Sequence, residues 1–193
     1  MNYIDELGIT RDQARGMVAE LQDMQDKELA EENLTDFVRQ AWHVVEPGTE
    51  LIWNWHINTL CAYLEAVYYG KIQYLVVNIP PGTMKSLIVS VFFPAWIWTS
   101  EPEYRFLCGS NVATLSTRDS LKMRQVINSE WYQKNWGEVF HLSKEQDAKT
   151  LFANSKRGHR ESQGMDGDIT GKRGSMIILD DPHDAKKTES DIT

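Results

Sequence analysis

The sequence predicts an α/β fold in which a mostly parallel central sheet is covered by helices on both faces. Two short apolar segments, 73–78 and 175–179, have the composition of strands buried on both faces. An apolar helix is expected directly after the first segment, over 86–99, and strands then alternate with helices along the chain. Right-handed crossovers between parallel strands follow from this alternation, so we expect a three-layer sandwich.

Local patterns place the other elements. Thr10 and Gln13 form a capping box that starts the first helix. Pro94 is expected to kink or shorten the helix at 86–99. Periodicity and turn residues further predict helices at about 33–46, 55–70 and 114–128, a strand at 104–108 before a turn at 109–111, and a hairpin turning at 155–158.

The loop after the first strand has the composition of a phosphate-binding loop. Residues 80–82, Pro-Pro-Gly, end the strand, and Lys85-Ser86 open the following helix. Backbone N–H groups converge at such a helix N-terminus, and the helix dipole favours anions there. A lysine at the end of the loop can reach the β- and γ-phosphates of a nucleotide, and the next serine can bind Mg²⁺.

The match to the P-loop pattern G-x-x-x-x-G-K-[ST] is incomplete. Ile79 and Met84 stand where the pattern has glycine, and Gly82 is the single glycine of the loop. On the loop alone, a Pro-Gly turn with a surface lysine is the alternative interpretation.

A second motif favours the nucleotide interpretation. The strand at 175–179 ends in Asp180 and Asp181, about 95 residues after Lys85. In P-loop NTPases the acid at the end of the second strand positions Mg²⁺, and the next acid can orient the attacking water. A helix cap or an Asp-Pro turn is the alternative for two adjacent acids.

These motifs resemble the N-terminal ATPase domain of the large terminase subunit of tailed bacteriophages, the motor that packages DNA. The similarity is carried by WHINTL…YYGKIQYLVVNIPPG, PPGTMKS and DITGKRGSMIILDDPHD, and it covers about residues 53–184. It implies a RecA-like (ASCE) P-loop fold that hydrolyses ATP with Mg²⁺ and drives viral double-stranded DNA into the prohead. A complete large terminase continues into a nuclease domain, so the resemblance also implies a chain truncated at its C-terminal end.

The resemblance assigns roles to individual residues. Lys85 and Asp181 are the expected catalytic residues, Ser86 and Asp180 the expected Mg²⁺ ligands, and His56 the expected adenine contact, although a lone histidine is as often a packed or surface residue. The expected nucleotide-binding residues are Pro81, Gly82, Thr83, Met84, Lys85, Ser86 and His56.

Two departures from the family and one basic loop add further expectations. The family usually has Glu where Asp181 stands, and many members have an Arg where Gly82 stands. An arginine that assists phosphoryl transfer would then come from Arg173 or from a neighbouring subunit. Lys172 and Arg173 lie in a basic loop that is expected to contact DNA phosphates or the adjacent subunit, with a solvated surface loop as the alternative.

Charge divides the chain into two segments. Residues 1–50 hold 12 acids and 4 bases, whereas 51–193 hold 16 of each, so the net charge of −8 belongs to the first segment. We expect an acidic N-terminal helical appendage at 1–50 and a P-loop ATPase domain at 51–193. The longest apolar run, 87–98, is too short to cross a bilayer, and Cys61 and Cys108 are expected to be reduced and buried.

The expected partners are double-stranded DNA, the portal protein of the prohead, the small terminase subunit and further copies of the chain in a ring, with no membrane. The expected location is the cytoplasm of the infected or lysogenic bacterial host. Two alternatives remain open at this point: a helicase-type nucleic-acid translocase, and a degenerate P-loop assembly protein without turnover.

Overall fold

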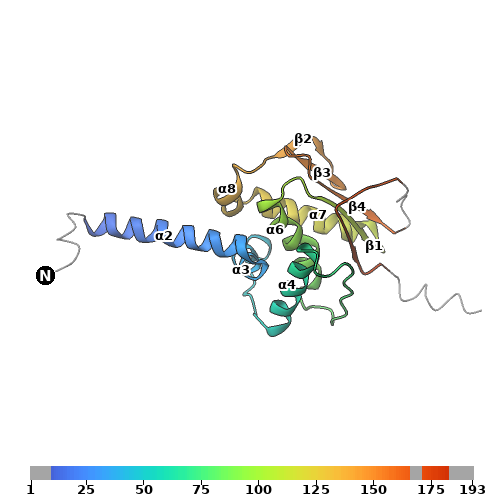
Figure 1. The fold of residues 1–193 in the computed structure, drawn as a ribbon, viewed down its shortest axis with the longest axis horizontal. Helices are drawn as coiled ribbons and strands as arrows, with labels where there is room; N and C mark the ends of the chain where they lie inside the picture. The colour runs from blue at the N-terminus through green and yellow to red at the C-terminus, as the bar shows by residue number, and fades with distance from the viewer. Residues whose placement is uncertain (1–9, 166–170, 183–193) are drawn as a thin grey trace, which may run out of the picture.

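The computed structural model of the chain describes residues 10–165 and 171–182 (Figure 1). The end of the expected ATPase domain, 183–193, lies outside the described residues. The helices are α2 (Arg11–Glu32), α3 (Leu34–Val45), α4 (Trp55–Tyr68), α5 (Lys85–Leu87), the π-helix η1 (Ile88–Phe92), α6 (Phe93–Ser100), α7 (Ala113–Asn128) and α8 (Glu130–Trp136). The strands are β1 (Arg105–Ser110), β2 (Leu142–Asp147), β3 (Leu151–Asn154), β4 (His159–Gly164) and β5 (Met176–Asp180).

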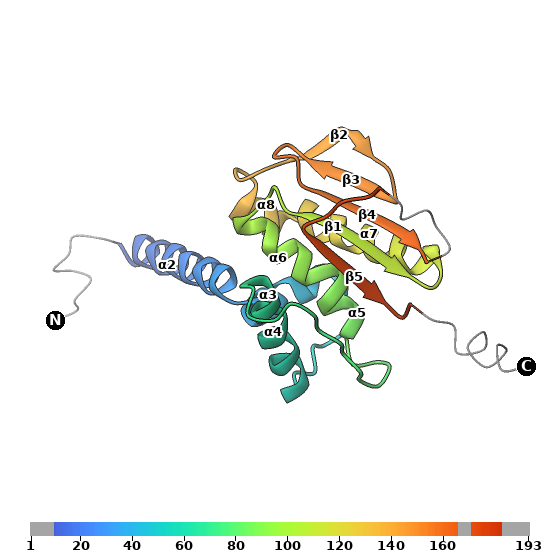
Figure 2. The same cartoon turned by 45° about the vertical axis from the view of Figure 1, so that its right-hand side comes forward.

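The five strands form one mixed sheet in the order β2-β3-β4-β1-β5, as Figure 2 shows. β1 lies between β4 and β5 and is parallel to both, with Leu107 level with Glu161 and Ile177. β2 and β3 pair antiparallel, and β3 continues antiparallel to β4 through the predicted hairpin. β1 extends through Ser110, so the turn predicted at 109–111 is wrong in its first two residues.

The predicted RecA-like three-layer sandwich with a mostly parallel sheet is wrong. Half of the strand pairings are antiparallel, and one face of the edge strand β5 is uncovered in the described residues. Ile178 is 6% exposed and faces the helices, whereas Ile177 is 64% exposed on the other face. Apolar composition indicates a strand, but it does not say whether a second helical layer covers it.

The segment 73–78, which the sequence predicts as a buried strand, forms no strand within the described residues. Leu75 and Val77 pack partly against the core, while Tyr74 and Val76 are exposed. The alternating apolar pattern therefore corresponds to a segment whose alternate side chains lie against the core. A strand also needs a neighbouring strand edge for its backbone hydrogen bonds, and the pattern carries no information about that edge.

The N-terminal helices begin as the sequence predicts. Thr10 and Gln13 form the capping box at the start of α2, with hydrogen bonds of 2.8 and 3.2 Å. α3 buries Phe37 and Ala41 in the same hydrophobic core as α4, α6 and β1. The hydrophobic core is therefore continuous across residue 50. Separately, no helix among the described residues is long and apolar enough to cross a membrane.

The helix that follows the phosphate-type loop changes its hydrogen-bond pattern halfway along. Within η1 the N–H of Phe93 donates to the carbonyl of Ile88, five residues earlier. Pro94 has no N–H for the carbonyl of Ser90, and its ring crowds that carbonyl in an α-helix. The kink expected at Pro94 thus takes the form of a π-helical turn, one of the usual causes of a bent helix.

A buried arginine binds the Ser90 carbonyl, which lacks an N–H donor from Pro94. Arg160, on β4, is fully buried, and its Nη1 donates to the Ser90 carbonyl oxygen. Its Nε donates to Ser162 Oγ at 3.3 Å, and Nη1 also lies 3.6 Å from Met123 Sδ on α7. One guanidinium therefore connects the sheet, η1 and α7.

We expect Arg160→Ala to lower the free energy of unfolding by about 3–5 kcal/mol, because its buried polar neighbours would lose their hydrogen-bond partner. Urea or guanidinium unfolding followed by circular dichroism measures this. Arg105→Ala, one strand away and exposed, is the matched control and should change stability by less than about 0.5 kcal/mol. Equal, small losses for both variants would contradict the connecting role of Arg160.

Candidate nucleotide-binding site

A pocket of about 500 Å³ lies between the loop at 79–87, the end of β5 and α7. Pro81, Gly82, Thr83, Met84, Lys85 and Ser86, the residues predicted to bind the nucleotide phosphates, all line it. Asp181 lines it from β5, and Arg118 and Lys122 line it from α7. Two motifs far apart in the sequence therefore meet at one concave site.

The loop adopts the backbone that a phosphate-binding loop needs, without the usual glycines. Gly82 has φ +80° and Met84 has φ +65°, in the left-handed region. Met84 thus takes the conformation that explains why the P-loop pattern has glycine there, at a cost of about 1–2 kcal/mol for a residue with a side chain. Thr83 Oγ1 donates to the Pro80 carbonyl at 2.7 Å and closes the turn.

His56 lies at the N-terminal end of α4 and reaches the same loop. Its Nε2 is 3.2 Å from the Thr83 carbonyl oxygen, so in the tautomer protonated at Nε2 it donates to the loop backbone. His56 is not among the residues that line the pocket. The contact with adenine stays a prediction.

Lys85 brings the two motifs into direct contact. Its Nζ lies 3.0 Å from Asp180 Oδ1 and 2.6 Å from Asp181 Oδ1. Partial burial lowers the pKa of Lys85, but the hydrogen bonds and charges of Asp181 and Asp180 outweigh that effect and raise the pKa above its ordinary value. The ammonium group therefore stays protonated and neutralises one of two adjacent carboxylates.

The end of β5 presents these carboxylates in different ways. The Asp180 side chain is largely buried, whereas that of Asp181 is exposed to the pocket. Asp181 has φ +46°, an uncommon backbone conformation outside glycine that aspartate tolerates better than most residues. The N–H of Asn111 donates to the Asp181 carbonyl at 3.1 Å and holds this turn against the end of β1.

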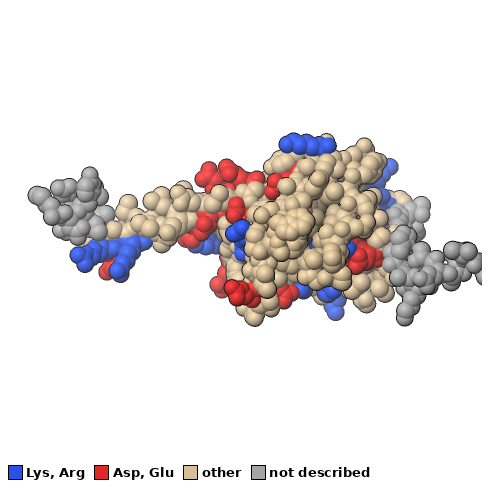
Figure 3. Space-filling model, turned by 90° about the horizontal axis from the view of Figure 1, so that it is seen from below, with Lys and Arg blue, Asp and Glu red and all other residues tan. Residues whose placement is uncertain are grey.

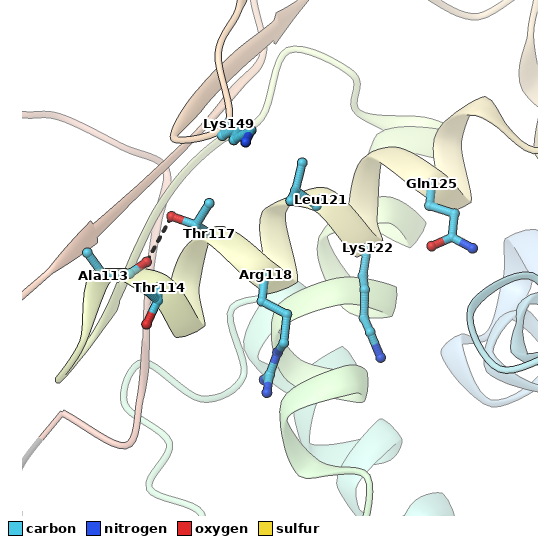
Figure 4. Close-up of a pocket in the computed structure, with 8 residues that line it drawn as sticks. All are labelled: Ala113, Thr114, Thr117, Arg118, Leu121, Lys122, Gln125 and Lys149. Carbon is cyan, nitrogen blue, oxygen red and sulfur yellow. Dashed lines mark hydrogen bonds between the residues drawn. The ribbon is translucent and has the colours of Figure 1, made fainter.

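Arg118 and Lys122 are site residues that the sequence analysis missed. They stand one turn apart on α7, and Figure 4 shows both side chains on the same side of the helix, away from Lys149. Lys122 pairs with Glu46 at 2.7 Å. Their i, i+4 spacing, on the helix that follows the strand expected at 104–108, was a usable signal, but it equally fits a solvated helix face.

The Arg118 guanidinium is held in place by a buried neighbour. Its Nε and Nη2 lie 2.9 and 2.8 Å from Asp119 Oδ1, and the Asp119 side chain is almost fully buried. Burial raises the pKa of Asp119, and the charges of Arg118 and Arg160 counteract this. Two of the five N–H groups of Arg118 bind Asp119, and the side chain lines the pocket.

Lys172 and Arg173 lie elsewhere. They precede the amino end of β5, while Asp180 and Asp181 stand at its carboxyl end. Lys172 Nζ binds Glu161 at 2.5 Å and Gln163 at 2.7 Å on β4, and Arg173 is exposed. Neither residue lines the pocket of its own chain, and their contact with DNA or a neighbouring subunit stays a prediction.

The residues present fit a magnesium ion bound together with phosphates. The described part of the chain contains no group of three or more His, Cys, Asp or Glu side chains that could hold a metal by itself. Mg²⁺ is usually bound by one or two carboxylates, with phosphate oxygens and water completing its octahedron. The carboxylates at the end of β5 and the hydroxyl of Ser86 are ligands of that kind.

No family model matches the sequence, and neither a curated protein nor a solved structure matches the chain. The function of the chain is therefore inferred from the residues of the site and from the resemblance of their motifs.

We expect Lys85→Met to lower the free energy of unfolding at neutral pH by about 1 kcal/mol, because two adjacent carboxylates lose their shared cation while remaining partly solvated. Thermal and denaturant unfolding without nucleotide measures the change. Lys156→Met, at the exposed hairpin turn, is the control that should leave stability unaltered. A Lys85→Met variant as stable as the control would mean that the ion pairs contribute nothing.

Proposed function

We propose that the chain is the ATP-hydrolysing motor domain of a phage terminase large subunit, which powers movement of viral double-stranded DNA into the prohead. The observation that supports this most is the contact of Lys85 with Asp180 and Asp181, beside the loop at 79–87. Lys85 and Asp181 are 96 positions apart in the sequence. A lysine that ends such a loop and faces acids that end a strand is the arrangement that P-loop NTPases use for Mg²⁺-dependent nucleotide hydrolysis. The proposal is independent of the RecA-like sandwich, which the structure excludes.

The roles of the residues follow from their positions. Backbone N–H groups of 82–86 bind the phosphates, and Lys85 reaches the β- and γ-phosphates. Ser86 and Asp180 would hold Mg²⁺, which would supply positive charge beside the phosphates. Asp181, exposed to the pocket, orients the attacking water.

Nucleotide binding changes the partners of Lys85. In the structure its ammonium binds both carboxylates, and phosphate oxygens compete for the same ammonium. With Lys85 bound to phosphate oxygens instead, Asp180 would be free to hold Mg²⁺ and Asp181 to orient water. The ion pairs thus keep the acids close to their working positions before ATP arrives.

Arg118 is the proposed source of additional positive charge at the γ-phosphate. It lines the same pocket as Lys85, and Asp119 holds its guanidinium from one side. Arg173, the candidate from the sequence, lies at the opposite end of β5. DNA, the portal protein and the small terminase subunit are the proposed partners, on the strength of the resemblance alone.

We expect Lys85→Met to weaken ATP binding about 100-fold or more, because it removes the loop cation that contacts the phosphates. Titration of a fluorescent ATP analogue with Mg²⁺ present measures this directly. Lys156→Met again serves as the control and should bind as the unmodified chain does. Binding within about threefold for Lys85→Met would rule out the nucleotide site.

Asp180→Asn and Asp181→Asn are expected to differ. Asp180→Asn should weaken Mg²⁺-dependent ATP binding, since the amide is a poorer ligand than a carboxylate. Asp181→Asn should keep binding but lose most hydrolysis, because it no longer orients water. Single-turnover hydrolysis of labelled ATP, alongside the binding titration, separates the two; identical behaviour of the variants would refute this division of roles.

Arg118→Ala is expected to slow single-turnover hydrolysis on the order of 10³-fold while ATP binding changes by less than about tenfold, since an arginine acts mainly on the transition state. Lys149→Ala, near the other side of α7, is the matched control and should leave both quantities unaltered. Equal rates for Arg118→Ala and the control would assign the additional charge to another residue.

A further inference from the structure

His56 reaches the loop at 79–87 from a helix that is anchored in the core. It is the second residue of α4, and Ile57 and Cys61, which follow on the same helix, are fully buried. Its ring meets the ring of Trp55 edge-on, with 6.2 Å between the ring centroids. The position of His56 is therefore set by α4 rather than by the loop.

The hydrogen bond of His56 goes to one particular peptide group of that loop. Its Nε2 lies 3.2 Å from the carbonyl oxygen of Thr83, and no backbone N–H of the described residues donates to the same oxygen. A carbonyl oxygen only accepts, so the imidazole is the donor. The C=O and N–H of a trans peptide point in opposite directions, so this bond also turns the N–H of Met84 away from His56. Met84 lines the pocket, whereas His56 does not.

The backbone around this peptide group favours the opposite orientation. Met84 has φ +65°, a conformation that a residue with a side chain adopts at a cost. Turning the peptide over would change ψ of Thr83 and φ of Met84 by about 180° and bring Met84 to a negative φ, outside the left-handed region. A glycine would have no such tendency, because it adopts either sign of φ. The loop of this chain therefore gains from an outside group that holds the peptide.

Charge on the outer surface does not replace that peptide. Figure 3 views the molecule from below, the side on which α4 lies in Figure 1. Most of the body visible there is uncharged, and its basic side chains are scattered rather than gathered in one patch. The groups that would attract a phosphate therefore lie within the pocket, where the orientation of each loop N–H matters.

We propose that His56 is a positioning residue: it holds the Thr83 carbonyl away from the pocket, so that the N–H of Met84 faces the phosphates. His56 thus compensates for the glycine that the P-loop pattern has where Met84 stands. The inference rests on the proposed nucleotide site, but it gives His56 a role that does not involve the base. Every ligand that carries a polyphosphate should then depend on His56 to the same degree.

Calorimetric titration of the full 193-residue chain with ATP or with inorganic tripolyphosphate, each with Mg²⁺, tests this role. We expect His56→Ala to weaken both ligands by the same factor, about tenfold, which corresponds to one lost hydrogen bond. His56→Gln, whose amide can donate to the same carbonyl, should bind both ligands within about threefold of the unmodified chain. The matched control is His43→Ala, which removes a histidine 2.7 Å from the Gln40 carbonyl oxygen on α3 and should alter neither affinity.

The same titrations in a Met84→Gly background test whether His56 acts through the backbone angle. Glycine adopts a positive φ without strain, so the loss caused by His56→Ala should fall from about tenfold to less than about threefold. An undiminished loss in this background would mean that His56 does not act through the orientation of the peptide, and it would overturn the proposal.

Nuclear magnetic resonance of the nucleotide-free chain separates failure of this role from failure of the proposed function. The coupling between the amide and α protons of Met84 reports its φ, which should become negative in His56→Ala and stay positive in His56→Gln. A φ that stays positive in His56→Ala overturns the proposal. So does a loss confined to ATP with tripolyphosphate unaffected, which would assign His56 to the base. An unmodified chain that binds neither ligand would instead refute the proposed nucleotide site, and the phosphate-positioning role with it.

Discussion

The position of the candidate site depends on one buried guanidinium. Arg160 extends from β4 under the sheet and donates to the Ser90 carbonyl in η1, in the helix that begins at Lys85. The same side chain touches Met123 on α7, the helix that carries Arg118. These contacts fix the sheet, the helix that begins at Lys85 and α7 relative to one another. The pocket is lined by residues from the loop at 79–87, the end of β5 and α7, so its geometry depends on the same contacts. A buried charge is costly unless it is hydrogen-bonded, and in the described residues Nε and Nη1 of Arg160 have partners whereas Nη2 has none.

The sequence predicted local features well where one short pattern determines one local structure. The Thr10 cap, the hairpin around 155–158 and the strand that ends at Asp180 are of this kind. It also predicted that Lys85 and the two acids belong to one site, and the structure brings them within hydrogen-bond distance. What it could not predict depends on contacts between distant segments. The two layers of the described fold, the absence of a strand partner for 73–78 among the described residues and the π-helical turn that contacts Arg160 all follow from which edges and faces meet in space.

Arg118 illustrates why a site residue can be missed. In the sequence it is one of several cations on an amphipathic helix, and nothing local distinguishes it from Arg124 or Lys122. Its significance comes from the burial of the neighbouring Asp119 carboxylate and from the loop across the pocket. Both features depend on the tertiary structure. Conversely, the P-loop pattern has a glycine where Met84 stands, because that position needs a positive φ. Met84 adopts a positive φ although it is not glycine. Residue type is therefore a weaker guide to such a loop than the conformation it takes.

The open edge of the sheet has a consequence for handling the protein in solution. Within residues 10–165 and 171–182, β5 is the last strand of the sheet, and its Ile177 and Leu179 are both exposed. A strand that combines apolar side chains with unpaired backbone groups is a template for the strands of other molecules. Because Asp180 ends that strand and Asp181 follows it, pairing of another strand with β5 would take place beside the carboxylates and obstruct the pocket. In concentrated or warmed samples, aggregation through this strand would therefore also close the pocket.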